Sequence, residues 1–204
     1  MYINFWYPAA LSEELKDEPI RARILGQNFV VYRDSKGQAH TLSDTCPHRG
    51  GALSAGVIRD DCIQCPYHGW RFDGEGYCHR IPSLGQDAKI PKRARVDAYP
   101  TQEQNGIVFT FLGDLEEKKR PPIMPIKELE DPESWRANWL TYEADINFER
   151  SIENGLDAAH NEFVHPTHGH EGTDEDYQVN DLNFVDNMFG EKKWGFGFWH
   201  AFKS

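Results

Sequence analysis

The chain has 204 residues, of which 39% are hydrophobic and 13% aromatic, so it is long enough for one large domain or two small ones. Its formal net charge of −11 argues against nucleic acids and anionic membranes as partners, because both attract cationic surfaces. The N-terminus lacks a basic region, so no signal peptide is predicted, and no segment approaches the roughly 20 apolar residues of a membrane span. We therefore expect a cytoplasmic protein.

Short β-type runs separated by turn residues fill most of the first half of the chain. This spacing predicts an antiparallel meander, and we expect an all-β domain over residues 1–113. The runs are 23–26, 29–32, 39–42, 56–58, 62–65, 70–72, 94–98 and 107–112. The stretch before them, 4–15, begins with aromatic residues and predicts an aromatic anchor followed by a short helical turn.

Two pairs of potential metal ligands interrupt this β pattern. One residue lies between Cys46 and His48, two lie between Cys65 and His68, and sixteen separate the pairs. Two thiolates and two imidazoles suit a [2Fe–2S] cluster in which two histidines replace two cysteines on one iron. Zinc is the alternative, since the same four ligands also bind Zn²⁺ tetrahedrally. Zinc motifs usually place both cysteines first, whereas each pair here has one of each, which favours the cluster.

The two other cysteines, Cys62 and Cys78, are expected to be reduced thiols. Residues 114–135 combine charges with four prolines, which predicts a linker between two domains. A strand is predicted over 139–143, and the run 194–200 also has the pattern of a strand.

A helix is predicted to begin after Asn147, whose side chain suits an N-cap. Asp157 and His160 are three residues apart, so they would share one face of this helix. His165 is five residues further on and would reach the same metal ion only if the helix ends between the histidines. Pro166 disfavours helical geometry at the residue before it, so we expect the helix to end there.

The two Cys–His loops, with their Pro, Gly and Trp neighbours, resemble those of the Rieske family. The run Asn154-x₂-Asp157-x₂-His160-x₄-His165 resembles the iron motif of the Rieske non-haem iron oxygenases. The resemblance implies an α+β protein. Its N-terminal all-β Rieske [2Fe–2S] domain would be followed, over residues 136–204, by the first part of a helix-grip-type α+β catalytic domain.

The resemblance also implies a role for each residue. The cluster ligands would be Cys46, His48, Cys65 and His68. His160 and His165 would bind a mononuclear Fe(II). Asp157 matches the aspartate that links this iron site to a Rieske histidine of a neighbouring subunit, and Asn154 matches a residue near the iron. Gly51 and Tyr67 stand where respiratory relatives have a disulfide, which points away from a respiratory subunit.

A protein of this kind would be the terminal oxygenase component of a multicomponent system. It would use O₂ and electrons from NAD(P)H, delivered by a reductase with or without a ferredoxin, to hydroxylate or oxidatively demethylate a small organic substrate. We expect a homotrimer. The alternative is a Rieske ferredoxin-like electron carrier without oxygenase activity, in which the histidines of the iron motif would be structural.

The family's third iron ligand is a carboxylate far downstream of the two histidines, so it is expected beyond Ser204 and the sequence is expected to be C-terminally incomplete. The carboxylates within the chain that could replace it are Glu171, Asp174, Glu175 and Asp181.

Overall fold

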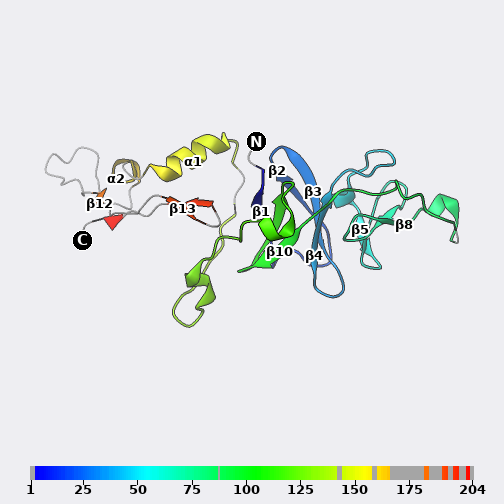
Figure 1. The fold of residues 1–204 in the computed structure, drawn as a ribbon, viewed down its shortest axis with the longest axis horizontal. Coiled ribbons are helices and arrows are strands. Elements are labelled where there is room, and N and C mark those ends of the chain that lie inside the picture. The colour runs from blue at the N-terminus through cyan, green and yellow to red at the C-terminus, as the bar shows by residue number, and fades with distance from the viewer. Residues whose placement is uncertain are drawn as a thin grey trace. The chain divides into compact units, whose positions relative to one another are not determined.

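The computed structural model divides the chain into two compact units, residues 1–123 and 124–204 (Figure 1). It describes residues 3–86, 88–141, 144–157, 160–165, 182–183, 190–192, 195–197 and 201–202. The architecture is mostly β, in agreement with the β pattern predicted for the first half.

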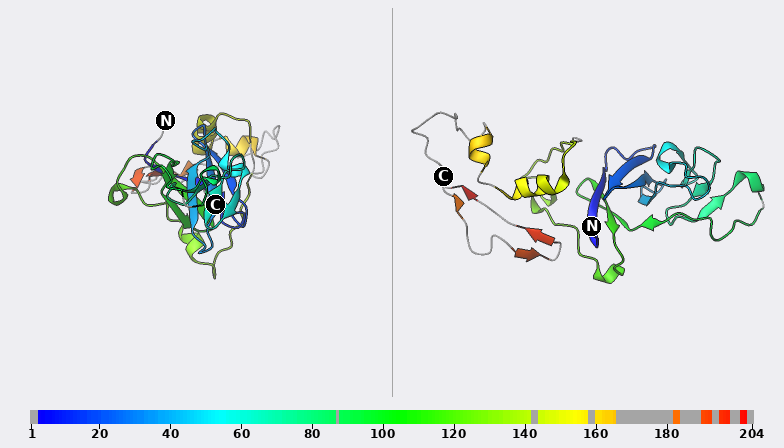
Figure 2. Two further views of the ribbon diagram at one scale, coloured as in Figure 1. Left: turned by 90° about the vertical axis from the view of Figure 1, so that its right-hand side faces the viewer. Right: turned by 90° about the horizontal axis from the view of Figure 1, so that it is seen from above.

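The first unit consists of antiparallel sheets joined by short turns (Figures 1 and 2). Its strands are β1 (Phe5–Leu11), β2 (Ile20–Ile24), β3 (Gln27–Arg33), β4 (Ala39–Ser43), β5 (Val57–Arg59), β6 (Cys62–Gln64), β7 (Arg71–Phe72), β8 (Cys78–Arg80), β9 (Ala98–Tyr99), β10 (Thr101–Gln104) and β11 (Ile107–Leu112). They form three sheets with the orders β1-β11-β10, β2-β3-β4-β9 and β5-β6-β7-β8. Short 3₁₀ helices lie at Leu53–Ala55, Pro82–Leu84 and Glu117–Lys119.

The opening stretch departs from the prediction. Residues 5–11 form β1, which pairs with β11 about 100 residues later, and Trp6 lies opposite Phe111. The predicted short helical turn is present, because the amides of Glu14 and Leu15 donate to the carbonyl of Leu11. The run 94–98 is likewise a strand only at its end, where β9 begins. Both strands differ from the prediction because strand pairing depends on residues far away in the sequence, which local sequence patterns do not contain.

Strand β3 separates two hydrophobic cores. Phe29 and Val31 belong to one core, together with Leu15 and Val108. Val30 and Tyr32 belong to the other. Because successive side chains of a strand point to opposite faces, this strand is buried on both sides. Each fully buried side chain of this size contributes about 1.5–3 kcal/mol. The second core also contains Leu42, Leu53, Ile63, Phe72, Cys46 and Cys65. The loops that carry the two Cys–His pairs therefore pack against this core.

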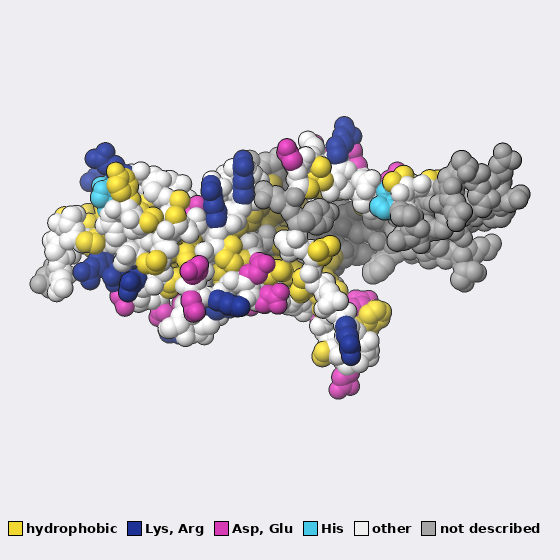
Figure 3. All heavy atoms as spheres, turned by 180° about the vertical axis from the view of Figure 1, so that it is seen from behind, with side chains coloured by type: hydrophobic (Ala, Val, Ile, Leu, Met, Phe, Trp, Pro, Cys, Tyr) yellow, Lys and Arg dark blue, Asp and Glu magenta, His cyan; other side chains and the backbone are white. Residues whose placement is uncertain are grey.

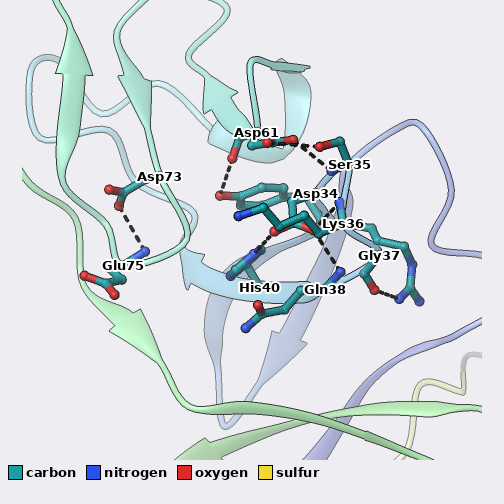
Figure 4. Close-up of polar contacts among 11 residues, drawn as sticks. Asp34, Ser35, Lys36, Gly37, Gln38, His40, Asp61, Asp73 and Glu75 are labelled. Atoms are coloured by element: carbon teal, nitrogen blue, oxygen red, sulfur yellow. Dashed lines mark hydrogen bonds and ion pairs between the residues drawn. The ribbon is translucent and has the colours of Figure 1, made fainter.

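Polar contacts join the β3–β4 hairpin to the β5–β6 turn (Figure 4). The Asp34 carboxylate accepts hydrogen bonds from the backbone amides of Lys36 and Gln38 and lies 3.0 Å from the His40 ring. The Asp61 carboxylate accepts from the amide and hydroxyl of Ser35 at 2.8 and 3.1 Å. Burial alone would raise the pKa of Asp34, but the hydrogen bonds from His40 and the two amides hold it below its usual value.

The second unit contains the helices α1 (Phe148–Leu156) and α2 (Asn161–Val164) and a 3₁₀ turn at Lys127–Glu130. Two antiparallel pairs follow: β12 (Leu182–Asn183) with β15 (Ala201–Phe202), and β13 (Gly190–Lys192) with β14 (Gly195–Gly197).

The local structure of the second unit agrees only partly with the sequence predictions. The Asn147 side chain accepts hydrogen bonds from the amides of Glu149 and Arg150, which confirms the predicted N-cap. The strand predicted over 139–143 is absent from 139–141, and 142–143 lie outside the described residues. In the run 194–200, β14 covers 195–197 and the rest is not described. Within the described ranges, no helix has the length and hydrophobicity that spanning a bilayer requires.

Candidate metal centres

Two loops with the same backbone pattern hold the Cys–His pairs. In the loop between β4 and β5, the Cys46 amide donates to the carbonyl of Gly51, and the Gly50 amide donates to the carbonyl of Cys46. In the loop between β6 and β7, the Cys65 amide donates to Trp70 and the Gly69 amide donates to Cys65. Each bond therefore spans the same number of residues in both loops.

Glycine makes this turn possible in both loops. Gly50 has a φ of 71° and Gly69 a φ of 69°, in the left-handed region that glycine adopts without strain. Asp44 anchors the first loop, because its buried carboxylate accepts from the amide and hydroxyl of Ser54 at 2.6 and 2.9 Å. The Cys and His side chains are thus presented by rigid, hydrogen-bonded turns.

The thiols lie inside and the imidazoles outside. Cys46 and Cys65 are each only 2% exposed, whereas His48 and His68 are exposed. The two imidazole rings lie 4.4 Å apart between centroids. The loops also approach closely at Gly51, where a Cβ would lie 3.1 Å from the Cys65 sulfur and 3.5 Å from the Cβ of Tyr67.

Aromatic side chains support both imidazoles. The ring of Trp70 is stacked on that of His48, with centroids 4.7 Å apart and planes 8° from parallel. The ring of Tyr67 lies 3.9 Å from that of His68. In the sequence, Trp70 is marked only as a neighbour of the second Cys–His pair and Tyr67 only as a substitute for a cysteine. Tyr67 directly precedes the histidine that it contacts, whereas the stacking of Trp70 on His48 is not indicated by proximity in the sequence.

The pKa shifts of these groups have opposite consequences for metal binding. Burial, followed by the neighbouring Cys65, raises the pKa of Cys46 to about 11, so without a bound cation the thiol would keep its proton at neutral pH. Loss of hydration and then the charges of His68 and Arg49 lower the pKa of His48, which favours the neutral imidazole that binds metals. A pair of sulfurs beside a pair of ring nitrogens fits a cluster with one all-Cys and one all-His iron.

The second candidate centre lies after α1. Asp157 follows the last residue of this helix, so it does not share a helical face with His160 as predicted, yet its carboxylate lies 3.8 Å from Nδ1 of His160. The helix predicted to continue to His165 ends at Leu156, and the separate helix α2 ends at Val164, so only the non-helical position of His165 agrees with the prediction. The rings of His160 and His165 lie 5.5 Å apart between centroids.

The imidazole of His160 fits a metal ligand. Both of its ring nitrogens are buried and have no hydrogen-bond partner among the described residues. Buried polar atoms are nearly always hydrogen-bonded, so two unsatisfied nitrogens on one ring mark a place for a ligand. Asn154 lies exposed in the last turn of α1, where its backbone carbonyl accepts from the amide of Asp157.

The alternative carboxylates lie in a region that is not described; they are Glu171, Asp174, Glu175 and Asp181. Among the described residues, no group of three or more His, Cys, Asp or Glu side chains is arranged to hold a single ion.

Known proteins resemble this chain in sequence and structure. A family model described as the Rieske [2Fe–2S] domain matches residues 5–100. The chain is 31% identical to a cholesterol 7-desaturase of Ciona intestinalis over 93% of its own length and 40% of the relative's. It is 33% identical to the oxygenase subunit of a tert-butanol monooxygenase / tert-amyl alcohol desaturase of Aquincola tertiaricarbonis, over 79% of this chain and 34% of that one.

A solved structure also resembles this chain. Dicamba monooxygenase bound to dicamba matches with a TM-score of 0.71 and 32% identity, over 79% of this chain and 48% of that one. The chain therefore spans less than half the length of each of these relatives. The Rieske domain implies a [2Fe–2S] cluster. A structure of dicamba monooxygenase with non-heme iron and dicamba also matches, with a TM-score of 0.57 and 32% identity over 64% of this chain and 40% of that one. The chain therefore carries a Rieske [2Fe–2S] domain over residues 5–100 and matches the oxygenase subunits of the Rieske oxygenases.

Proposed function

We propose that Cys46 and Cys65 bind one iron of a [2Fe–2S] cluster and that His48 and His68 bind the other. The observation that carries this assignment is the sorting of the four side chains into a buried sulfur pair and an exposed imidazole pair. The cluster would take up and release single electrons. The stacked Trp70 would fix the orientation of His48, and the exposed edges of both imidazoles would be accessible to an electron donor.

The second centre would hold a mononuclear Fe(II) through His160 and His165. Its support is the pair of unsatisfied nitrogens on His160 and the placement of His165 just beyond α2. The Asp157 carboxylate would orient the His160 ring and fix its tautomer through Nδ1, leaving Nε2 for the metal. The iron would supply an open face for O₂, with a carboxylate as the expected third ligand. Asn154 would lie near this site.

The whole protein would be the terminal oxygenase component of a multicomponent Rieske oxygenase. A reductase, with or without a ferredoxin, would supply electrons derived from NAD(P)H. The names of the relatives include a cholesterol desaturase, a 4β-methylsterol monooxygenase and a tert-butanol monooxygenase, which supports a small organic substrate for this chain. We propose hydroxylation or oxidative demethylation as the reaction, a homotrimer as the assembly and the cytoplasm as its location.

The domain organisation belongs to the same proposal. Residues 1–113 would be the Rieske domain, 114–135 a linker, and 136–204 the first part of a helix-grip-type α+β catalytic domain. Support for this division comes from the two compact units of the structure and from the family match over 5–100.

Metal and sulfide analysis tests the proposal directly. Protein purified without air should contain about three irons and two acid-labile sulfides per chain if both centres form. Replacing His160 by Ala should remove one iron and leave the cluster's electron paramagnetic resonance signal unchanged. Two irons with or without this replacement would favour the electron-carrier alternative, and zinc without sulfide would contradict both centres.

A further inference from the structure

The ten residues after β11 and Gly113 remain attached to the first unit. The sequence predicts a linker from residue 114 onward, yet the first compact unit extends to Ile123. Within the segment 114–123, which we call the strap, only Ile123 is buried, and the 3₁₀ helix Glu117–Lys119 lies beside β1 and β10 (Figure 1). The strap therefore has the composition of a linker but is part of the first unit.

Asn4 holds the beginning of the strap. Its backbone amide donates to the carbonyl of Leu112 at 2.6 Å, and its side-chain oxygen accepts from the amides of Asp114 and Leu115 at 3.0 and 3.2 Å. Asn4 has a φ of 71°, in the left-handed region that asparagine adopts more readily than most residues. Gly113 permits this approach, because a Cβ there would lie 2.1 Å from the side-chain oxygen of Asn4. The start of the chain is thus bonded to the start of the strap.

Trp6 holds the end of the strap. Its indole Nε1–H donates to the carbonyl of Pro121 at 2.7 Å. The Trp6 ring also makes an edge-on contact with Phe111, with centroids 5.3 Å apart. The guanidinium of Arg120 lies 5.3 Å from the centre of the same phenylalanine ring, and its Nε–H donates to the carbonyl of Leu115. Arg120 therefore connects the strap both to β11 and to its own beginning.

The strap is attached by few contacts. No residue of 114–123 belongs to either hydrophobic core of the first unit. A cleft of about 360 Å³ lies between strap and sheet, lined by Trp6 and Gln104 on the sheet and by Arg120 and Pro121 on the strap. Detachment of the strap would therefore leave both cores intact.

Electrostatic attraction does not hold the strap in place. The strap contains three acidic and three basic side chains, and all of them except Arg120 are exposed. Acidic and basic side chains are likewise interspersed on the described part of the face shown in Figure 3. The bonds that attach the strap through Asn4 and Trp6 join uncharged groups, so neither salt nor a change of pH near neutrality should release them.

We propose that Asn4 and Trp6 form a clasp that sets where the free chain after the first unit begins. With the clasp closed, only residues 124–135 of the proposed linker are unattached to the first unit. With the clasp open, all of 114–135 would be free. A segment of 12 residues spans at most about 40 Å and one of 22 at most about 75 Å, so opening nearly doubles the reach of the chain.

Opening of the clasp would be a local event. Segments with few buried apolar contacts open at a lower cost in free energy than the cores do. The clasp requires no bound metal. Only its consequence for the linker rests on the proposed function, because the linker is part of the proposed division into a Rieske domain and a catalytic domain.

Limited proteolysis with trypsin tests the clasp. The strap offers two exposed cleavage sites, Lys118 and Lys119, whereas the proline after Arg120 blocks cleavage there. When opening and closing are fast, the cleavage rate follows the population of the open state. Cleavage at the two strap lysines, identified by mass spectrometry, therefore measures opening of the clasp. The internal reference is Lys36, in the exposed turn between β3 and β4.

Three substitutions remove or retain single parts of the clasp. Asn4→Gly keeps the left-handed backbone but removes the side-chain oxygen, whereas its matched control, Asn4→Asp, keeps an acceptor oxygen. Trp6→Phe keeps an aromatic ring beside Phe111 but removes the N–H that donates to Pro121. None of these residues is a proposed metal ligand.

Cleavage at the strap lysines should accelerate about tenfold in Asn4→Gly, which loses two hydrogen bonds, and about fivefold in Trp6→Phe, which loses one. Asn4→Asp should stay within about twofold of the unsubstituted chain. Cleavage after Lys36 should be the same in all of them. Equal strap cleavage in every variant would overturn the proposal. A parallel acceleration at Lys36 would also overturn it, because the whole unit would then be unfolding.

Small-angle X-ray scattering tests the consequence for the linker. The doubly substituted Asn4→Gly/Trp6→Phe chain should have a larger maximum dimension than the unsubstituted chain in the same oligomeric state. Faster strap cleavage with an unchanged maximum dimension would support the clasp and refute its effect on the linker. A chain that binds neither iron nor sulfide would contradict the proposed function, whereas the cleavage rates would still decide whether the clasp exists.

Discussion

The two units of this chain differ in how they are stabilised. All buried hydrophobic side chains among the described residues lie at or before Ile123. In the second unit, the apolar residues of α1 form a stripe at i, i+4 and i+8, and Phe148, Ile152 and Leu156 are 54%, 54% and 48% exposed. The whole net charge of −11 also falls within residues 124–204. The first unit has its own cores, whereas a nine-residue helix without packing partners is marginal.

Truncating one phenylalanine in each unit gives the largest expected contrast. Phe29 is 1% exposed and makes an edge-to-face contact with Tyr99, so Phe29→Ala should destabilise the chain by about 3–5 kcal/mol. Phe148→Ala should change the stability by less than about 0.5 kcal/mol, because the side chain is already exposed. Chemical denaturation followed by tryptophan fluorescence measures both. Similar losses in the two variants would show that α1 is packed.

Gly→Ala at three positions sharpens the contrast. Gly76 has a φ of 82°, and a Cβ there would overlap the carbonyl oxygen of Val96, so Gly76→Ala should cost about 3 kcal/mol. Gly37 has a φ of 83° with open space around it and should cost about 1 kcal/mol. Gly155→Ala in α1 should stabilise the helix by up to about 1 kcal/mol. Thermal unfolding should rank them in this order. A tolerated Gly76→Ala would contradict the close approach of residues 76 and 96.

Acid titration tests the Asp34 contacts of the first unit. The pKa of Asp34 is below its usual value when folded, so its stabilising contribution is present above about pH 4 and lost as the pH falls through the folded pKa. Asp34→Asn removes the charge and should cost about 1–2 kcal/mol at pH 7. The difference in unfolding free energy from the unsubstituted chain should shrink toward pH 3. A difference that stays constant with pH would argue against an ionised, hydrogen-bonded Asp34.

The smallest expected effect is in the second unit. Asn147→Ala removes the side-chain cap of α1 and should lower helix stability by about 1 kcal/mol, which circular dichroism at 222 nm detects as a small loss of signal. Asn147→Asp should preserve the cap. Neither variant should move the unfolding transition of the first unit. A shift in that transition would mean that the two units unfold together.

The sequence by itself determined the chemistry of the candidate sites. The spacing of Cys46, His48, Cys65 and His68 limits the metals they suit, because ligand type and order are properties of a short stretch of chain. Local rules also predicted the N-cap at Asn147 and the non-helical position of His165. These features need only neighbours within a few residues.

Only the tertiary structure decided how these groups are placed. Local patterns missed β1, because a strand at residues 5–11 depends on a partner about 100 residues away. They also placed Asp157 within a helix that ends at Leu156. The sorting of thiols inward and imidazoles outward and the unsatisfied nitrogens of His160 depend on burial and long-range packing. Burial and packing result from many contacts across the molecule, so no single segment of the sequence determines them.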